Sequence, residues 1–278
     1  GNYRVLEFFN RFAAEGPGNL KRAVLSLEAF QAETREVLKK TTEAMSQNLF
    51  FQRLSCLLES GEREVLEVLS GFRVPVLALA LEMQSGSGGP IKIDGSRLLS
   101  VLEVLHRYTL IEVSREADTV YYYASPIVSQ LVGPSPGFSH PEAGNYFLDV
   151  IEKTGGAVKA YEEAFYHFHQ CRDVERVGEL GNTLSRHYDS IYMYANAFYY
   201  AEAVYRLAGD KTPGIVLNRL GLLYDLYGKY DTALELYKKA LPEVQRLKDK
   251  KAEGTLLNNI SQIYKARGDY DTALDYLE

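Results

Sequence analysis

His167, His169 and Cys171 are of the residue types that bind metal ions or act in nucleophilic catalysis. On a helix, His167 and Cys171 lie one turn apart on one face, whereas His169 points to another side. A structural zinc site needs four ligands, and a catalytic thiolate needs a base oriented by a third group. Neither a fourth ligand nor such an acid is evident. The sequence therefore predicts no metal site and no catalytic residue, and favours helix surface and packing.

Two glycine-containing segments could be considered for phosphate binding. A nucleotide-binding loop needs a glycine-rich turn followed by Lys and then Ser or Thr. Gly228-Lys229 is followed by Tyr230, and residues 86–90 lack the Lys-Ser/Thr ending. We expect no cofactor-binding residue, no cofactor and no enzymatic activity in this chain. If this chain is a piece of a longer ATPase, we expect the catalytic core of that protein to lie before residue 1.

The clearest pattern is a repeat, because residues 217–233 and 257–273 are nearly one segment written twice, forty residues apart. A helical hairpin that cannot bury its apolar face alone stacks on copies of itself. Gly228 and Gly268 stand where the first helix of each copy must end, a place that favours positive φ. The small positions are Gly221/Ser261, Ala233/Ala273 and Ala240, and the expected interhelical residues are Leu220, Tyr224, Tyr237, Ile260, Tyr264 and Leu277.

This pattern resembles the tetratricopeptide repeat, in a longer-helix variant because the period is 40. An earlier, degraded copy aligns Asn196, Phe198, Ala201, Tyr205 and Ala208 with Gly228, Tyr230, Ala233, Tyr237 and Ala240. Residues 160–176 indicate one more hairpin. About four hairpins meet the minimum of roughly three for a stable array.

The resemblance implies a peptide-binding concave face lined by the first helix of each hairpin. Asn259 falls where relatives use Asn to hold a peptide backbone, and Arg219 is its equivalent one copy earlier. Asp225 and Lys265 face similarly by helical spacing. An Asn amide can pair with a backbone N–H and C=O together. We therefore expect Arg219, Asp225, Asn259 and Lys265 to bind a partner, the alternative being a solvated polar face.

Upstream, the periodicity of residues 60–132 changes from helix to strand. Ser60 is expected to cap a helix whose apolar face is Val65, Leu66, Leu69 and Phe72; residues 76–81 form a second helix. Asp94 should cap a third, with Leu98, Leu99, Leu102 and Leu105 inward. Residues 110–114 and 119–123 are β-rich runs about a four-residue turn, 115–118. Three helices followed by a hairpin is the layout of a winged helix.

A winged helix raises the question of DNA binding. Residues 61–132 hold nine acids and six bases, and the third helix offers only Arg97 and Arg107, with Glu103 between them. Holding phosphates requires several cations on the reading helix. The charge balance therefore favours a packing module.

Residues 1–60 read as wholly helical, with a break at residues 16–19. The opening segment, residues 1–8, is similar to the end of the nucleotide-binding core of STAND-type signalling NTPases, the NB-ARC/AP-ATPase-like proteins. Those proteins continue through a helical domain and a winged helix into repeats, in this same order. The chain departs from that pattern at Tyr3, where Pro is usual, and at Ser125, where His often precedes Pro.

Composition fits a folded, intracellular protein, with 46% apolar and 24% charged residues. The net charge of −6 offers no general attraction for nucleic acid or anionic lipid, and no apolar run approaches a membrane span. Two cysteines are too few for a disulfide framework and suit a reducing cytoplasm. The chain has no initiating Met and stops inside its last repeat, so we expect a piece of a longer polypeptide.

The sequence thus predicts a mainly α chain with four parts: a helical domain (1–60), a winged helix with a small β-hairpin (61–132), a linker and lead-in (133–156) and tetratricopeptide-like repeats (157–278). In the linker, three prolines and three glycines within 133–144 should prevent regular structure. The expected function is a non-catalytic, ligand-sensing part of a STAND-type ATPase. The alternatives are a transcription regulator whose winged helix binds DNA and a stand-alone adaptor. The expected partner is a protein or peptide, not a membrane; self-association of the parent stays open.

Overall fold

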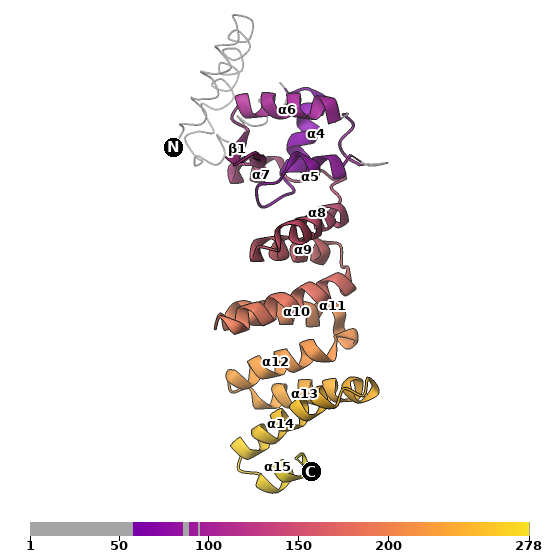
Figure 1. Ribbon diagram of the computed structural model, residues 1–278, viewed down its shortest axis with the longest axis vertical. Helices are drawn as coiled ribbons and strands as arrows, with labels where there is room; N and C mark the ends of the chain where they lie inside the picture. The colour runs from indigo at the N-terminus through magenta and orange to yellow at the C-terminus, as the bar shows by residue number, and fades with distance from the viewer. Residues whose placement is uncertain (1–57, 86–88, 94, 278) are drawn as a thin grey trace, which may run out of the picture. The chain divides into compact units, whose positions relative to one another are not determined.

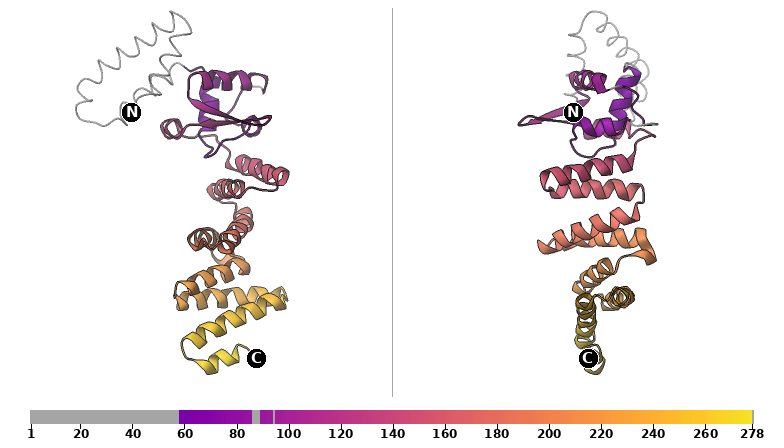
Figure 2. Two further views of the ribbon diagram at one scale, coloured as in Figure 1. Left: turned by 60° about the vertical axis from the view of Figure 1, so that its left-hand side comes forward. Right: turned by 45° about the vertical axis from the view of Figure 1, so that its right-hand side comes forward.

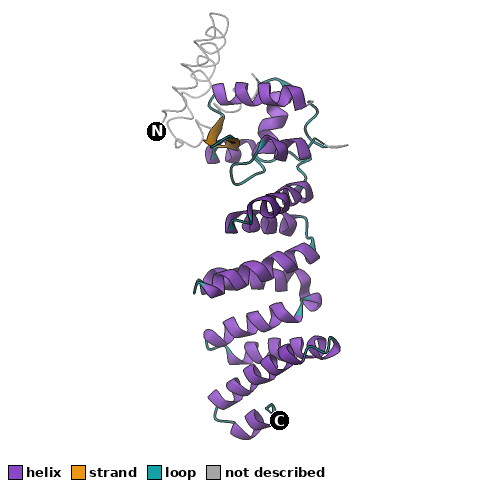
Figure 3. Cartoon of the chain, in the orientation of Figure 1, coloured by secondary structure: helices purple, strands orange, loops and turns teal. Residues whose placement is uncertain are grey.

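The computed structural model describes residues 58–85, 89–93 and 95–277. The chain separates into two compact units, residues 1–143 and residues 144–278. Secondary structure in the described part is mainly helical, with one small antiparallel sheet (Figure 3). The predicted helices of residues 1–57 and the proposed cap Asp94 lie outside the described residues. Within the described residues, no helix combines the length and apolar character needed to cross a membrane.

In the described part of the first unit, three helices precede a β-hairpin and another helix follows it (Figure 1). The elements are α4 (Ser60–Leu69), α5 (Ala78–Met83), α6 (Gly95–Arg107), β1 (Ile111–Glu116), β2 (Thr119–Ala124) and α7 (Pro126–Val132). The strands pair from Ile111 opposite Ala124 to Glu116 opposite Thr119. Val76 adds a single bridge to this sheet, exchanging backbone hydrogen bonds of 2.9 and 2.7 Å with Tyr122.

The core of this unit follows the predicted apolar faces. The buried side chains include Val65, Leu66, Leu69, Phe72, Leu98, Leu102 and Leu105. Leu99 was expected among them but is 53% exposed, because position 99 turns away from the stripe formed by 98, 102 and 105. Phe138 packs edge-on against Phe72, with ring centroids 5.2 Å apart.

Four boundaries in the first unit differ from the sequence expectation. Ser60 is the first helical residue and not the cap: the Glu59 N–H donates to the Glu62 carboxylate at 2.9 Å. The second helix starts two residues late, because the backbone at Val76 pairs with β2. The turn of the hairpin consists of residues 117–118 and not 115–118, because strand pairing continues as far as Glu116 opposite Thr119. Lastly, helix begins at His140 inside the Pro- and Gly-rich segment.

The second unit is built of helices in pairs. Figures 1 and 2 show that they follow one another as successive layers. They are α8 (His140–Thr154), α9 (Val158–Gln170), α10 (Val174–Ser190), α11 (Tyr194–Ala208), the 3₁₀ turn η1 (Gly209–Lys211), α12 (Gly214–Leu226), α13 (Tyr230–Arg246), α14 (Lys250–Ala266) and α15 (Tyr270–Asp275). Pro141 fits within the first turn of α8, where its missing N–H has no intrahelical partner. The prediction that no helix survives in 133–144 is therefore wrong after Ser139.

One turn geometry closes the last three hairpins. Tyr192, Gly228 and Gly268 all have positive φ, at 62°, 70° and 79°. Each donates its N–H to the carbonyl three residues back, and the next residue donates to the carbonyl five residues back. The prediction of positive φ at both glycines is confirmed, and Tyr192 shows that the same turn forms without glycine.

This geometry changes the alignment of the earlier copy. Helix α11 starts 36 residues before α13, whereas the aligned aromatic and small residues had suggested 32. The Ser185 hydroxyl donates to the Ala197 carbonyl at 2.8 Å, just as Ser261 donates to Ala273 at 2.9 Å. Ala197 therefore matches Ala233, and Ala201 matches Tyr237. The predicted alignment was wrong by four residues, because one helical turn returns side chains to nearly the same face.

Small residues set the contact between helices of a pair. A Cβ at Gly221 would lie 2.4 Å from the Cε1 atom of Tyr237, whose side chain is fully buried. Leu220 and Ile260 are fully buried as predicted, while Tyr224 and Tyr264 are half-buried. Leu277 is 59% exposed, so its predicted place between helices is wrong.

A polar cluster joins α9, α10 and α11. The Glu162 carboxylate accepts hydrogen bonds from Tyr188 at 2.6 Å and Tyr200 at 3.0 Å, and pairs with Lys159 at 3.2 Å. Burial alone raises the pKa of Glu162, but the hydrogen bonds from Tyr188, Lys159 and Tyr200 outweigh it and lower that pKa. Burial and the bond to Glu162 raise the pKa of Tyr188 to about 12.

We expect Glu162→Gln to remove a pH-dependent part of the stability. A carboxylate whose pKa is lowered by folding stabilises the fold above its ordinary value of 4.5, and this contribution disappears as the pH falls through the lowered value. The melting temperature of the natural chain should therefore exceed that of the variant most at about pH 6, and the gap should close toward about pH 3. Glu179→Gln, on the exposed side of α10, is the control. A gap that stays constant with pH would contradict the assignment.

Gly221→Ala should destabilise the second unit. The added methyl group overlaps Tyr237, and overpacking costs about 1–3 kcal/mol, more than the helix propensity that alanine gains. Gly254→Ala in α14 meets nothing within 4 Å and should instead stabilise by about 0.5–1 kcal/mol. Urea denaturation followed by circular dichroism measures both. Equal stabilisation by the two substitutions would contradict this prediction, because the α12–α13 contact would then accommodate the added methyl group without a loss of stability.

Candidate partner-binding surface

The four predicted binding residues lie on the first helices of the last two hairpins. Arg219 and Asp225 belong to α12, and Asn259 and Lys265 belong to α14. Helix α10 is the corresponding helix of the preceding hairpin. We refer to the side of these three helices that carries Arg219 on α12 and Asn259 on α14 as the α10/α12/α14 face.

Arg219 is engaged within the chain. Its Nη1 atom lies 3.0 Å from the Asp189 Oδ2 atom on α10, and the Arg219 side chain is only 16% exposed. Burial lowers the pKa of Arg219, while the Asp189 carboxylate opposes that shift. Sequence reasoning missed Asp189, although the 36-residue offset makes it the counterpart of Asp225. This ion pair fixes the Arg219 guanidinium between two hairpins.

Asn259 makes the corresponding contact one hairpin later. Its Nδ2 atom donates to the Oδ1 atom of Asn218 on α12 at 3.0 Å. Asn218 was not predicted either, because the residue that aligns with Asn259 one copy earlier is Arg219 and not its neighbour Asn218. In the part of the chain that the structure describes, the second N–H and the carbonyl oxygen of the Asn259 amide make no hydrogen bond and can serve another group.

The two remaining predicted residues differ in exposure. Asp225 is half-buried, and burial raises the pKa of its carboxyl group. Lys265 is exposed. The four predicted residues are therefore an ion-paired Arg, a hydrogen-bonded Asn, a half-buried Asp and an exposed Lys. A separation of six positions turns Asp225 and Lys265 about 120° around their helices from Arg219 and Asn259.

An exposed apolar stripe on α12 was not predicted. Ile215, Leu222 and Leu226 are 58%, 40% and 55% exposed, and their spacing around Arg219 puts them on one face. The corresponding positions are Glu179, Arg186 and Ser190 on α10, and Thr255, Gln262 and Ala266 on α14. A position-by-position comparison of the copies would have revealed this stripe from the sequence, because only α12 has a large apolar side chain at all three positions.

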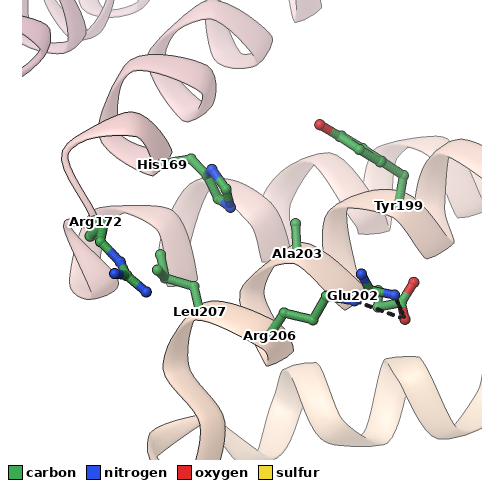
Figure 4. A pocket seen from close by; sticks show the side chains of 7 residues that line it. All are labelled: His169, Arg172, Tyr199, Glu202, Ala203, Arg206 and Leu207. Carbon is green, nitrogen blue, oxygen red and sulfur yellow. Dashed lines mark hydrogen bonds and ion pairs between the residues drawn. The ribbon is translucent and has the colours of Figure 1, made fainter.

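A pocket of 530 Å³ lies elsewhere in the same unit (Figure 4). Arg206 on α11 pairs with Glu202 there through its Nε and Nη2 atoms, at 3.2 and 2.8 Å. The pocket is lined by His169, Arg172, Tyr199, Glu202, Ala203, Arg206 and Leu207.

The three residues considered for metal binding have separate surroundings. His167 is buried and stacks on Phe147 at 5.7 Å, while His169 stacks on Phe165 at 5.9 Å. The Cys171 thiol is free and donates to the Phe168 carbonyl at 3.3 Å. Among the residues that the structure describes, no group of three or more His, Cys, Asp or Glu side chains is placed to hold a metal ion.

The repeat geometry has a counterpart in a known family. Residues 212–278 match the tetratricopeptide repeat. The match covers α12 to α15, the two hairpins that contain the repeated segments 217–233 and 257–273. Tetratricopeptide repeats typically bind protein partners. No curated protein sequence matches the chain.

Several solved structures show a low similarity to this chain. MamA is 18% identical over 50% of this chain and 84% of its own, with a TM-score of 0.32. A STAND protein with a tetratricopeptide repeat sensor from Pyrococcus horikoshii is 14% identical over 90% of this chain and 52% of its own, with a TM-score of 0.29. The Cut9–Hcn1 assembly of APC/C is 16% identical over 90% of this chain and 42% of its own, with a TM-score of 0.33. Likeness at this level says nothing about shared function.

Proposed function

We propose that the α10/α12/α14 face binds an apolar segment of a partner polypeptide. The observation that carries this proposal is the composition of α12. Its inner side buries Val216, Leu217 and Leu220, yet its outer side presents Ile215, Leu222 and Leu226 to solvent. A helix that is apolar all round is normally covered on all sides.

Polar groups beside the stripe supply orientation. The free N–H and carbonyl of Asn259 can pair with one peptide unit of an extended segment. Lys265 and Asp225 offer charges of opposite sign on neighbouring helices. Because Arg219 is held by Asp189, it acts in this proposal as a fixed positive group beside the stripe.

At a finer level, we propose a non-catalytic, ligand-sensing part of a cytoplasmic STAND-type signalling ATPase. The support is the resemblance of residues 1–8 and the order of elements after it. Three helices, a hairpin and the bridge at Val76 are compatible with a winged helix between the helical part and the repeats.

A transcription regulator with a DNA-binding winged helix is the second candidate. Helix α6 would be its reading helix, and it exposes Arg97 and Arg107 but also Glu103 and Leu99. Phosphate contact depends on a concentration of cations, so this composition favours the first proposal. A stand-alone adaptor shares the same binding face and differs only in what precedes residue 1.

Peptide selection tests the binding face. Peptides selected from a random display library on the natural chain should lose about ten-fold in affinity, or about 1.4 kcal/mol, in the Leu222→Asp variant. Leu247→Asp is the matched control, because Leu247 is 60% exposed and lies at the end of α13. Isothermal titration calorimetry measures the affinities. Failure to enrich any peptide, or equal loss in both variants, would refute the proposal.

The absence of catalysis is tested separately. The purified chain with Mg²⁺ and ATP should release no phosphate above the buffer rate, because no glycine-rich Lys-Ser/Thr loop occurs in the sequence. A coupled phosphate-release assay with a catalytically active ATPase as positive control measures this. Turnover that copurifies with the chain through two columns would contradict the proposal.

A further inference from the structure

A second pocket of the repeat unit borders the α10/α12/α14 face. Its volume is 530 Å³, and it is lined by residues of α10, of α9 and of the turn before α9. Tyr161 on α9 and His187 on α10 are among these residues, and we call it the Tyr161–His187 pocket. The inference below rests on the proposed function, because it concerns the chemistry of the same partner segment.

The pocket lies on the side of α10 that belongs to this face. Thr183 and His187 line it one helical turn apart, on the same side of α10. With the 36-residue offset, Thr183 is the counterpart of Arg219, and Arg186, which also lines the pocket, is the counterpart of Leu222. A segment that crosses from Leu222 toward α10 therefore meets Arg186 and then this pocket.

Much of the pocket wall is apolar. Val158 and Leu184 supply aliphatic surface, and Tyr161 supplies an aromatic ring. Gly156 has φ of 78°, and a Cβ there would lie 2.7 Å from the Cε2 atom of Tyr161. Glycine at this position therefore lets the turn before α9 lie against the Tyr161 ring. A concave site of this size and composition is suited to a large, mainly apolar group.

Two polar side chains of the pocket are available to a ligand. The Thr183 hydroxyl is already used, since it donates to the Glu179 carbonyl at 3.0 Å. In the described residues, by contrast, neither the Tyr161 hydroxyl nor the His187 imidazole makes a hydrogen bond, although the His187 ring packs edge-on against Tyr188 at 5.3 Å. A ligand that covers these groups must offer them a hydrogen bond, because a polar group buried without a partner weakens binding.

We propose that the Tyr161–His187 pocket binds a tyrosine side chain of the partner segment. The phenol ring fills the apolar space, and its hydroxyl can both donate and accept a hydrogen bond. It can therefore satisfy the Tyr161 hydroxyl or the His187 imidazole. A phenylalanine or leucine side chain would cover both groups and leave them without a partner.

Arg186 disfavours competing charged side chains. It is exposed, and within the described part of the chain its guanidinium group makes no ion pair. Its positive charge repels a lysine or arginine of the partner, whereas an aromatic ring beside a guanidinium group is favourable. An aspartate or glutamate would be attracted to Arg186, but it is too small to fill 530 Å³. Tyrosine meets the requirements of size, polarity and charge together.

The spacing of the helices sets the position of this tyrosine in the partner. Asp189 of α10 and Arg219 of α12 pair at 3.0 Å, so the two helices are neighbours, and packed helices lie about 8–10 Å apart. An extended peptide advances about 3.3 Å per residue. We therefore expect the tyrosine about three positions from the residue that covers Leu222.

Titration of the full chain with N-acetyltyrosinamide tests the pocket by itself. We expect saturable binding with a dissociation constant on the order of 1 mM, measured by NMR. N-acetylphenylalaninamide should bind about five-fold more weakly, because one hydrogen bond is lost. Thr183→Phe fills the pocket and should weaken both ligands about ten-fold or more. Ser100→Phe, on the exposed side of α6, is the control for an added ring, and circular dichroism verifies that each variant is folded.

Tyr161→Phe combined with His187→Phe tests the hydrogen bond. This double variant keeps two rings and removes both polar groups, so the preference for the tyrosine ligand over the phenylalanine ligand should disappear. A variant that merely loosens the fold would weaken both ligands alike and keep the preference. A preference that persists would overturn the assigned hydrogen bond. Natural affinity in Thr183→Phe, or no saturable binding at about 10 mM, would overturn the site, and tighter binding of N-acetyltryptophanamide would overturn the choice of a phenol.

Selected peptides separate this inference from the proposed function. The peptides enriched on the natural chain should contain a tyrosine whose replacement by alanine costs about ten-fold in affinity, but costs nothing in Thr183→Phe. Peptides that weaken in Leu222→Asp yet need no tyrosine would overturn the inference and leave the proposed function intact. Binding of N-acetyltyrosinamide without any enriched peptide would refute the proposed function, and with it the assignment of the tyrosine to a partner segment.

Discussion

The close approach of paired helices is the constraint on which the second unit depends. Ala197, Ala233 and Ala273 occupy the same place in three successive second helices, and the first two are fully buried. Opposite them stand Ser185, Gly221 and Ser261. Where the residue is serine, its hydroxyl satisfies the alanine carbonyl; where it is glycine, the space is taken by the ring of Tyr237. Two solutions to one packing problem thus alternate along the stack.

Polar contacts then fix the order of the layers. Glu162 on α9 accepts from tyrosines on α10 and α11, Arg219 on α12 pairs with Asp189 on α10, and Asn259 on α14 donates to Asn218. Each contact joins residues at least 26 positions apart. Apolar packing alone tolerates sliding between similar helices, whereas such pairs are satisfied in only one register. This specificity complements the nonspecific burial of leucine and alanine.

The sequence was informative where chemistry forces a residue type and weak where geometry decides. Gly228 and Gly268 marked the helix ends because glycine adopts positive φ readily, but Tyr192 adopts the same conformation and carried no such signal. Because no glycine marks the end of α10, the predicted alignment of α11 was wrong by four residues. Arg219 and Asn259 were correctly placed on first helices, yet their partners depend on the stacking of hairpins, which no single copy encodes. The exposure of Leu222 likewise follows from the neighbours of α12 and not from its own pattern.

The same contacts that order the layers also shape the α10/α12/α14 face. When a partner approaches the α12 stripe, Arg219 is already paired with Asp189 and Asn259 already donates one hydrogen bond to Asn218. Neither side chain therefore needs to be ordered on binding. Preorganised groups lose less conformational entropy on association than free side chains do. A ligand that competed for Asp189 or Asn218 would instead have to replace an existing bond and would loosen the contact between hairpins. Ligands that use the apolar stripe and the spare amide of Asn259 are therefore favoured over ligands that seek out the arginine.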